Sequence, residues 1–353
     1  MNNPSRTERF IVDKRFLSRR REVIHMSFNQ VVLREQYRKV RGLGDRLELM
    51  KEQIDWEPFR PLVAGVFHDD KETGGRPHTD EITIVRAMLL QECYGLSDPE
   101  LEFQVNDRLS FRNFLSFPET IPDFSTIWKI RERLKEAGAE PKIWQELQRQ
   151  LDQKGYAIKK GVIQDASFIE ADLGRKRYYK EKKAKERGET VEYTEKQMRH
   201  MDNDGTFSIK HGQVHFGYKN HIKLDIGNTL IREYEVTTAS LHDGEIDLVK
   251  EGDQKAYRDK GYFGKKLNCF GVEDRTMKRA TRGHPLNKKE WENNRKISKI
   301  RAPGERPFAV MKRVFHGART RVKTLRRVSI KEMLKCFAFN LYQLVTLVRR
   351  ALA

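Results

Sequence analysis

The spacing of hydrophobic positions changes after Gly155. Before that residue they recur every three or four positions, which is the period of an amphipathic helix. The clearest set is Ile82, Val85, Met88, Leu89 and Leu90. After Gly155, β-branched residues are frequent in 158–169 and 214–236, and Asp225 opens an Asp-Ile-Gly-Asn stretch typical of a hairpin turn. The pattern predicts a helical N-terminal part followed by a mixed α/β part.

Capping residues divide the helical part into short helices. Ser97 or Asp98 can cap one helix, and Asp123 can cap another over Thr126–Ala137. The second helix carries the basic residues Lys129, Arg131, Arg133 and Lys135. A group of short helices that ends in a basic helix is typical of a helix-turn-helix DNA reader. We predict that the first three of these basic residues contact DNA; the alternative is a small helical bundle with a charged outer face.

The two ends of the chain differ in hydrophobicity. The N-terminal end is polar and basic with a helical run at Phe28–Ile54, whereas Met333–Val348 is the most apolar segment. Lys335 and Asn340 interrupt that segment, and it is too short to cross a membrane, so we expect a buried helix. The expected division is 1–70, a basic helical arm or lead-in; 71–153, a helix-turn-helix-like DNA-binding domain; 154–328, a mixed α/β domain; and 329–353, a C-terminal helix packed on the core.

The charge of the chain indicates a polyanionic partner. The formal net charge is +19, and Arg306–Lys331 contains nine Lys/Arg and no Asp or Glu. Gly174–Glu189 holds eight Lys/Arg against three Glu, and is either a surface excursion that orders on DNA or a solvated loop. The electrostatic field of so large an excess of positive charge attracts nucleic acid. An acidic membrane would be the competitor, but the sequence has neither a lipidation signal nor a transmembrane run.

The cysteines and the N-terminus favour a cytoplasmic protein, associated with the nucleoid. Cys93, Cys269 and Cys336 lie far apart and match neither a zinc spacing nor a disulfide framework. The first ten residues, MNNPSRTERF, lack the apolar core of a signal peptide.

Candidate chemistry is concentrated in Ser298–Lys312, SKIRAPGERPFAVMK. Glu305 and Lys312 are seven residues apart, so on a helix they share one face within about 20°. A carboxylate that binds a divalent metal and an ammonium that binds a phosphate suit DNA chemistry; the alternative is a solvated helix with salt bridges. Pro307 is tolerated only in a first helical turn, so the helix should begin near Glu305. Arg301 would then lie in the lead-in, as a clamp for phosphate or carboxylate.

Two aspartates have the strand-like settings that a metal-binding carboxylate needs. Asp165 follows an apolar pair and precedes a small Ala-Ser, and Asp259 lies in a short segment broken by Gly261. We expect Asp165 on a first strand, Asp259 after a fourth strand and Glu305 on a later helix. Three converging carboxylates can hold two Mg²⁺ or Mn²⁺ ions about 3.5–4 Å apart. These hard ions prefer oxygen ligands, so the site needs no histidine.

Other candidates near these residues are weaker. Asp243 is the rival for the second carboxylate, although it leads into a loop that contains glycine. Glu170 should point to the opposite face of the strand from Asp165, since five is an odd offset. His211 and His215 flank a glycine in a strand-like run, which favours a structural role. Lys210 is a candidate phosphate contact.

In their order and spacing these motifs resemble the DDE transposases of prokaryotic insertion sequences, nearest to the IS-five type. The resemblance covers the chain from about Gly74 to the C-terminus. The matching stretches are GRPHTD at 75–80, YGLSDPELE, RLSFRNFL, IPDFSTIWKIRERL, VIQDASFIEA around Asp165, HFGYKNHIKLD, VTTASLHD, the D-x-G-Y element at Asp259, and the R-(3)-E-(6)-K signature of Arg301, Glu305 and Lys312. Two positions depart from the family pattern: Ser167 stands where Thr is usual, and Ser298 where a Tyr sometimes occurs.

The resemblance implies an α/β fold: an RNase-H-like mixed sheet flanked by helices over 154–328, with an all-helical DNA-binding domain before it. It implies an enzyme that binds the terminal inverted repeats of an element, cleaves DNA with two Mg²⁺ or Mn²⁺ ions held by Asp165, Asp259 and Glu305, and joins the ends to target DNA. Synapsis of two ends implies a homodimer on double-stranded DNA. Two alternatives remain: an RNase-H-like nuclease without strand transfer, and a sequence-specific DNA-binding protein derived from a transposase.

Overall fold

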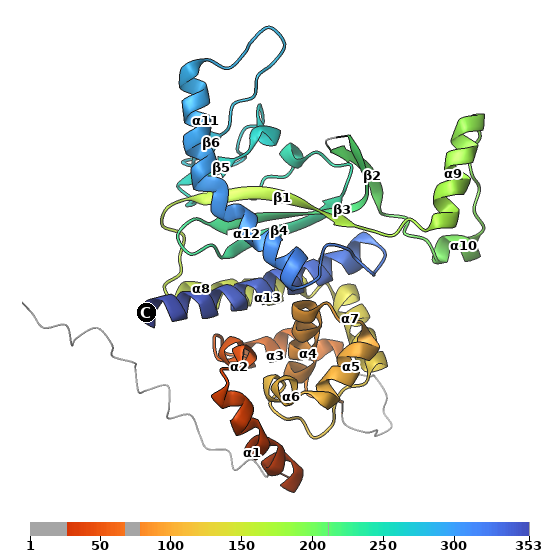
Figure 1. The fold of residues 1–353 in the computed structure, drawn as a ribbon, viewed down its shortest axis with the longest axis vertical. Helices are drawn as coiled ribbons and strands as arrows, with labels where there is room; N and C mark the ends of the chain where they lie inside the picture. The colour runs from red at the N-terminus through yellow and green to blue at the C-terminus, as the bar shows by residue number, and fades with distance from the viewer. Residues whose placement is uncertain (1–26, 68–77, 211, 353) are drawn as a thin grey trace, which may run out of the picture.

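The computed structural model describes residues 27–67, 78–210 and 212–352. A helical region and a mixed sheet lie on opposite sides of the long helix α13 (Leu325–Leu352) (Figure 1). His211 and the first part of the GRPHTD motif, 75–77, lie outside the described residues. Across the described ranges, none of the helices combines the length and the apolar character needed to cross a bilayer.

The helical region spans residues 28–153. Its helices are α1 (Phe28–Gly42), α2 (Arg46–Lys51), η2 (Glu57–Phe59), α3 (Arg60–Val63), η3 (Ala64–Val66), α4 (Glu81–Tyr94), α5 (Asp98–Asp107), α6 (Leu109–Phe114), α7 (Phe124–Ala137) and α8 (Glu140–Gln153). Ser97 and Asp123 cap α5 and α7, each accepting a hydrogen bond from the backbone N–H three residues ahead. The predicted caps are therefore confirmed.

The segment before residue 70 is more than a lead-in. Trp56, Phe59 and Val63 are buried in the main hydrophobic core. The ring of Trp56 stacks on that of Phe337 in α13, with centroids 6.2 Å apart. The described part of this segment, 27–67, is helical and packs on a helix nearly 300 residues later in the chain, a contact that local sequence cannot reveal; the boundary at residue 70 stays a prediction.

Within the described residues the sheet has six strands and a mixed topology. They are β1 (Val162–Glu170), β2 (Thr206–Lys210), β3 (Gln213–Asp225), β4 (Ile231–Thr238), β5 (Lys255–Arg258) and β6 (Glu273–Thr276). The order is β2-β3-β1-β5-β6, and β4 also pairs with β3. β1, β2 and β4 run antiparallel to β3, whereas β5 and β6 continue the sheet from β1 in parallel. This is the expected RNase-H-like mixed sheet flanked by helices, and the predicted fold class is confirmed.

The connection from β1 to β2 contains helices, contrary to expectation. α9 (Arg175–Arg187) and α10 (Glu195–Arg199) form here, so the alternative of a solvated loop for Gly174–Glu189 is wrong. The short strand β2 then pairs with the start of β3. Because of this extra strand, Asp259 follows the fifth strand of the chain rather than the fourth.

A nearly continuous helical rod crosses the sheet after β6. It consists of α11 (Lys288–Arg301), the 3-10 turn η6 (Ala302–Gly304), α12 (Glu305–Ala309) and the π-helical turn η7 (Val310–Val314) (Figure 1). α12 begins at Glu305, as Pro307 predicted. Arg301, however, is the last residue of a helix and not part of an irregular lead-in.

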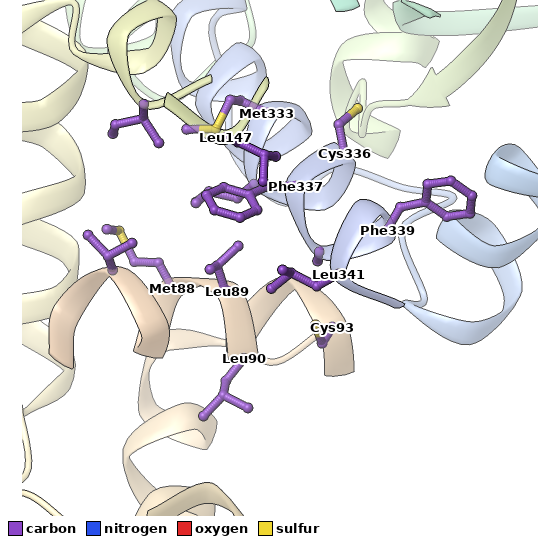
Figure 2. Close-up of a cluster of buried hydrophobic side chains, with 14 of the residues drawn as sticks. Met88, Leu89, Leu90, Cys93, Leu147, Met333, Cys336, Phe337, Phe339 and Leu341 are labelled. Atoms are coloured by element: carbon purple, nitrogen blue, oxygen red, sulfur yellow. The ribbon is translucent and has the colours of Figure 1, made fainter. Parts of the chain in front are cut away.

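Helix α13 joins the two halves of the molecule through one continuous core. Figure 2 shows Phe337 among Met88 and Leu89 of α4, Leu147 of α8 and Met333 of its own helix. On its other side α13 contacts β4, where the Asn340 side chain bonds both the N–H and the C=O of Ile231. Lys335 is buried and pairs with Glu332 at 2.5 Å. The predicted buried helix is confirmed, and the two polar residues that interrupt its apolar sequence, Lys335 and Asn340, have partners inside the protein.

Candidate active site

A cavity of about 420 Å³ lies where β1, the end of β5 and the helical rod meet. Its lining residues are Asp165, Ala166, Ser167, Phe168, Glu170, Lys210, His215, Asp259, Arg301, Glu305, Phe308, Lys312 and Ala318. The three predicted carboxylates thus come together from a strand, a post-strand turn and a helix start. Three of the predicted phosphate-binding cations, Arg301, Lys312 and Lys210, line the same cavity.

Asp165 stands in the middle of β1, just beyond the residues that pair with β5. Its Oδ1 accepts a hydrogen bond from the backbone N–H of Ala166, and its Oδ2 accepts one from Arg301 Nη2 at 2.8 Å. Burial raises the pKa of Asp165 to about 6; the Asp259 and Glu305 carboxylates act in the same direction, and Arg301 opposes them. The carboxylate therefore sits in a site that already holds more negative charge than one arginine neutralises.

Asp259 follows β5 directly and is fixed by a tight turn. Its Oδ1 accepts a hydrogen bond from the Gly261 N–H at 2.7 Å, and a Cβ on Gly261 would lie 2.9 Å from that oxygen. A side chain at position 261 would therefore displace the Asp259 carboxylate from this position. The preceding Arg258 is buried, and its guanidinium donates to Asp274, Thr276 and the Lys265 carbonyl. These bonds tie the end of β5 to β6, and so set the position from which Asp259 reaches the cavity.

Glu305 reaches the cavity because the helical rod packs closely on β1. At Gly304 an added Cβ would lie 3.0 Å from Ile163 Cγ2, so the residue before Glu305 must be small. Pro307 is buried in the first turn of α12, where its missing N–H costs no helical hydrogen bond. Glu305 and Lys312 both line the cavity, as expected from their spacing of seven residues.

Lys312 lies in the π-helical turn and is half-buried among charges of both signs. Burial lowers its pKa, as does the nearby Lys210, whereas Glu170 and Glu305 act in the opposite direction. Lys210 and Lys219 also lie near the ring of Phe168, with their Nζ atoms 5.7 and 5.2 Å from its centroid. One side of the cavity is therefore cationic, and the opposite charge is concentrated in the three carboxylates.

The oxygen atoms of the three carboxylates suit a hard divalent cation, although the carboxylates do not lie close enough together to bind a single ion. Asp165, Asp259 and Glu305 offer only carboxylate oxygens, the ligands preferred by Mg²⁺ and Mn²⁺. Among the described residues, no three His, Cys, Asp or Glu side chains lie close enough to coordinate a single ion. The Arg301 guanidinium supplies positive charge to Asp165 instead. The type and the charge of these ligands therefore fit the expected metal. Binding of a metal ion would affect Arg301 most, because this arginine pairs with Asp165.

The basic residues predicted on α7 have different surroundings. Lys129 is exposed, as a DNA contact requires. Arg131 is buried: its guanidinium bonds both carboxylate oxygens of Asp98 at 2.7 and 2.8 Å and the amide oxygen of Gln91. The prediction that Arg131 contacts DNA is therefore wrong, because this arginine joins α7 to α4 and α5. Arg133 is partly buried and donates to the Val66 carbonyl.

Sequence reasoning missed the cavity role of Glu170 and His215. Both line the cavity, with His215 Nδ1 2.5 Å from Glu170 Oε1 and its ring stacked on Phe168 at 4.7 Å. The prediction that Glu170 faces away is wrong, because the cavity extends along β1 from Asp165 to the end of the strand. Beyond Ile163, β1 pairs with β3 but no longer with β5, and consecutive residues from Asp165 to Phe168 line the cavity, so alternation along the strand does not decide which side chains reach it.

The rival Asp243 lies outside the residues that line the cavity. It begins η4 (Asp243–Glu245), and its Oδ1 lies 2.8 Å from Lys219 Nζ. The two short turns η4 and η5 (Lys260–Tyr262) are in contact, so Asp243 stands behind the Asp259 turn. Tyr262, which ends the second of these turns, is buried and packs on Arg258.

Comparison with protein-family models agrees with this geometry. Residues 34–133 match the family described as "Transposase domain (DUF772)", and residues 157–341, more than half of the chain, match the family "Transposase DDE domain". The first match begins well before Gly74, so the resemblance covers more of the helical region than the motifs indicated. No solved structure matches the chain. The narrower IS-five type stays a prediction; the chain belongs to the DDE transposases of insertion sequences.

Proposed function

We propose that this DNA transposase binds the terminal inverted repeats of its insertion sequence, cleaves DNA there with divalent metal ions and joins the ends to target DNA. The observation that carries the proposal is the convergence of Asp165, Asp259 and Glu305 in one cavity beside Arg301 and Lys312. Each carboxylate comes from a different element, and those of Asp165 and Asp259 accept hydrogen bonds from backbone N–H groups beside them.

In this proposal Asp165, Asp259 and Glu305 hold the metal ions. When bound, two Mg²⁺ or Mn²⁺ ions supply a deprotonated water or 3′-hydroxyl as nucleophile and neutralise charge on the leaving oxygen. The buried Asp165 accepts the Ala166 N–H, which fixes the direction of its free lone pairs. Asp259 is held in the same way by Gly261. Both carboxylates are thus oriented before DNA arrives.

The cations that line the cavity position the scissile phosphate. Lys312 shares a helical face with Glu305, so a phosphate near that carboxylate's metal lies within reach of its ammonium. Arg301 has a second task, since it pairs with Asp165 in this structure. If a metal ion were bound at Asp165, the Arg301 guanidinium would be available to bind a DNA phosphate. Two copies of the chain would hold the two element ends.

The rival functions lack a comparable observation. A pure DNA-binding protein has no use for three carboxylates that line one cavity, because like charges there oppose ionisation, as the raised pKa of Asp165 shows. A nuclease without strand transfer would use the same cavity. Joined products distinguish it from a transposase.

The test is an assay of nicking and joining with the full-length protein. We expect a labelled duplex that carries the flanking inverted repeat to be nicked at the repeat boundary with Mg²⁺ or Mn²⁺. No nicking should occur with EDTA, and joined products should appear when a target plasmid is added. Nicking without joining would favour the nuclease, and tight binding without nicking in any metal would favour the binding protein.

Lys312→Ala is expected to weaken DNA binding and to reduce its dependence on salt. If Lys312 neutralises one phosphate, the slope of log K against log salt should fall by about 0.9. Fluorescence anisotropy at several salt concentrations measures both quantities. Lys331→Ala is a suitable control. Lys331 does not line the cavity, and its Nζ lies 2.6 Å from Glu92 Oε1. An unchanged slope for Lys312→Ala would exclude the phosphate contact.

A further inference from the structure

The connection between β1 and β2 forms a helical arm, defined here as residues 174–205. Figure 1 shows α9 and α10 beyond the edge of the sheet, apart from both the helical region and the rod. Tyr178 and Tyr179 of α9 are about half exposed, at 48% and 49%. α9 has no apolar face, and Ala184 is its buried residue among those whose side chains are described. Packing against the body of the protein therefore cannot be the purpose of this helix.

α9 carries a large excess of positive charge. Residues 175–187 contain eight Lys/Arg and two Glu. Of these glutamates, Glu181 is already engaged by Arg177 and Tyr193. Lys182, Lys183 and Lys185 are exposed, and in the described part of the chain none of them pairs with a carboxylate. Like charges three and four residues apart destabilise a helix, so a polyanion would relieve this repulsion.

The base of the arm is anchored firmly to the catalytic half. Arg177 donates to the Asp202 carbonyl at 2.8 Å, and its guanidinium lies 5.7 Å from the Phe216 ring of β3. The buried Asp202 carboxylate accepts the Tyr218 hydroxyl at 2.5 Å. At the end of the arm, Asp204 accepts the N–H of Leu325, the first residue of α13. The arm is thus fixed in direction relative to the sheet.

Strand residues on either side of the arm line the cavity. The chain leaves β1 at Glu170 and returns through β2 to Lys210, and both residues line the cavity. A duplex with its scissile phosphate in the cavity extends beyond it in at least one direction. α9 has 13 residues and so spans about 20 Å, more than half a turn of B-form DNA.

We propose that α9 is a DNA-binding arm whose lysines contact the phosphate backbone of duplex DNA next to the cleavage site. The inference rests on the proposed function, since it takes the cavity as the place where DNA is cut. The duplex is either the element end or the target, and both present the same phosphates. The contact is electrostatic and independent of base sequence, because lysine ammonium groups on a mobile stem bind phosphate as point charges.

The test replaces three exposed lysines of the arm together, Lys182→Gln, Lys183→Gln and Lys185→Gln. The matched control removes the same charge elsewhere, by Lys154→Gln, Lys159→Gln and Lys160→Gln in the exposed segment before β1. Two labelled duplexes of about 30 base pairs, three helical turns, serve as probes. One has a random sequence and the other carries the terminal repeat.

The affinity of the arm variant for at least one probe should be lower by a factor of about ten or more. The slope of log K against log salt should be smaller by up to about 2.7, which is 0.9 for each lost contact. The control should retain the wild-type slope. A loss on the random duplex alone assigns the arm to target DNA, a loss on the repeat duplex alone assigns it to the element end, and a loss on both assigns it to both. Equal melting temperatures of the two variants show that folding is unaffected.

Wild-type affinity and slope in the arm variant would overturn the inference. Sedimentation of the two variants detects the alternative, a protein partner: self-association lost with DNA affinity unchanged would also overturn it. These results are distinguishable from failure of the proposed function. If the wild-type protein binds neither duplex, the proposed function fails; if it binds and the arm variant binds equally, the arm proposal alone fails.

Discussion

Asp165→Asn, Asp259→Asn and Glu305→Gln are each expected to abolish metal-dependent DNA cleavage while leaving DNA binding intact. Each change keeps the size of the side chain and removes one negative charge from the cavity that all three line. The loss of a metal ligand removes several kcal/mol of transition-state stabilisation, which corresponds to at least about a thousandfold in rate. Single-turnover nicking of a labelled repeat duplex measures the rate, and anisotropy measures the binding.

Asp243→Asn is the matched control for this series. Asp243 is a neighbouring carboxylate that pairs with Lys219 and does not line the cavity, so its variant should keep most of the cleavage activity. Nicking within tenfold of wild type in any of the three variants would remove that residue from the proposed site. A loss in Asp243→Asn as large as that in Asp259→Asn would restore Asp243 as a rival.

The positions of the three carboxylates were predictable because each depends on local sequence. Apolar residues before Asp165 predict a strand, Gly261 marks the turn that Asp259 caps, and Pro307 limits the helix start to Glu305. The convergence of these elements was expected only from a family resemblance. It depends on parallel pairing of β1 with β5 and on the close approach of Gly304 to Ile163, neither of which has a local signature.

Errors arose where a distant partner decides what a side chain does. Arg131 lies among basic residues of a helix, which predicts an exposed side chain. It is buried instead, because its guanidinium bonds Asp98, 33 positions earlier in the chain. Glu170 was placed on the wrong face because the pattern of alternation contains no information on how far the cavity extends along β1. The helix α9 escaped prediction for another reason. It has no apolar periodicity, and its formation follows from the anchors at Asp202 and Asp204.

Phe337→Ala is expected to destabilise the whole molecule, because Phe337 belongs to the core that joins the helical region to the half that contains the mixed sheet. Its side chain is fully buried, and its ring lies 6.2 Å from that of Trp56 and 5.5 Å from that of Phe59. Truncation of a buried phenylalanine costs about 3–5 kcal/mol of unfolding free energy, from lost transfer energy and from the cavity left behind. Urea denaturation followed by circular dichroism measures this loss.

The control on the same helix is Val348→Ala, since Val348 is 37% exposed and its truncation should change stability by about 0.5 kcal/mol or less. A loss below about 1 kcal/mol for Phe337→Ala would mean that the two halves fold independently of α13. The helical region would then be a separate domain attached by a linker. A large loss of unfolding free energy instead means that α13 holds the surfaces proposed to bind DNA in fixed positions relative to each other. A duplex bound at the exposed Lys129 would then be aligned with the cavity.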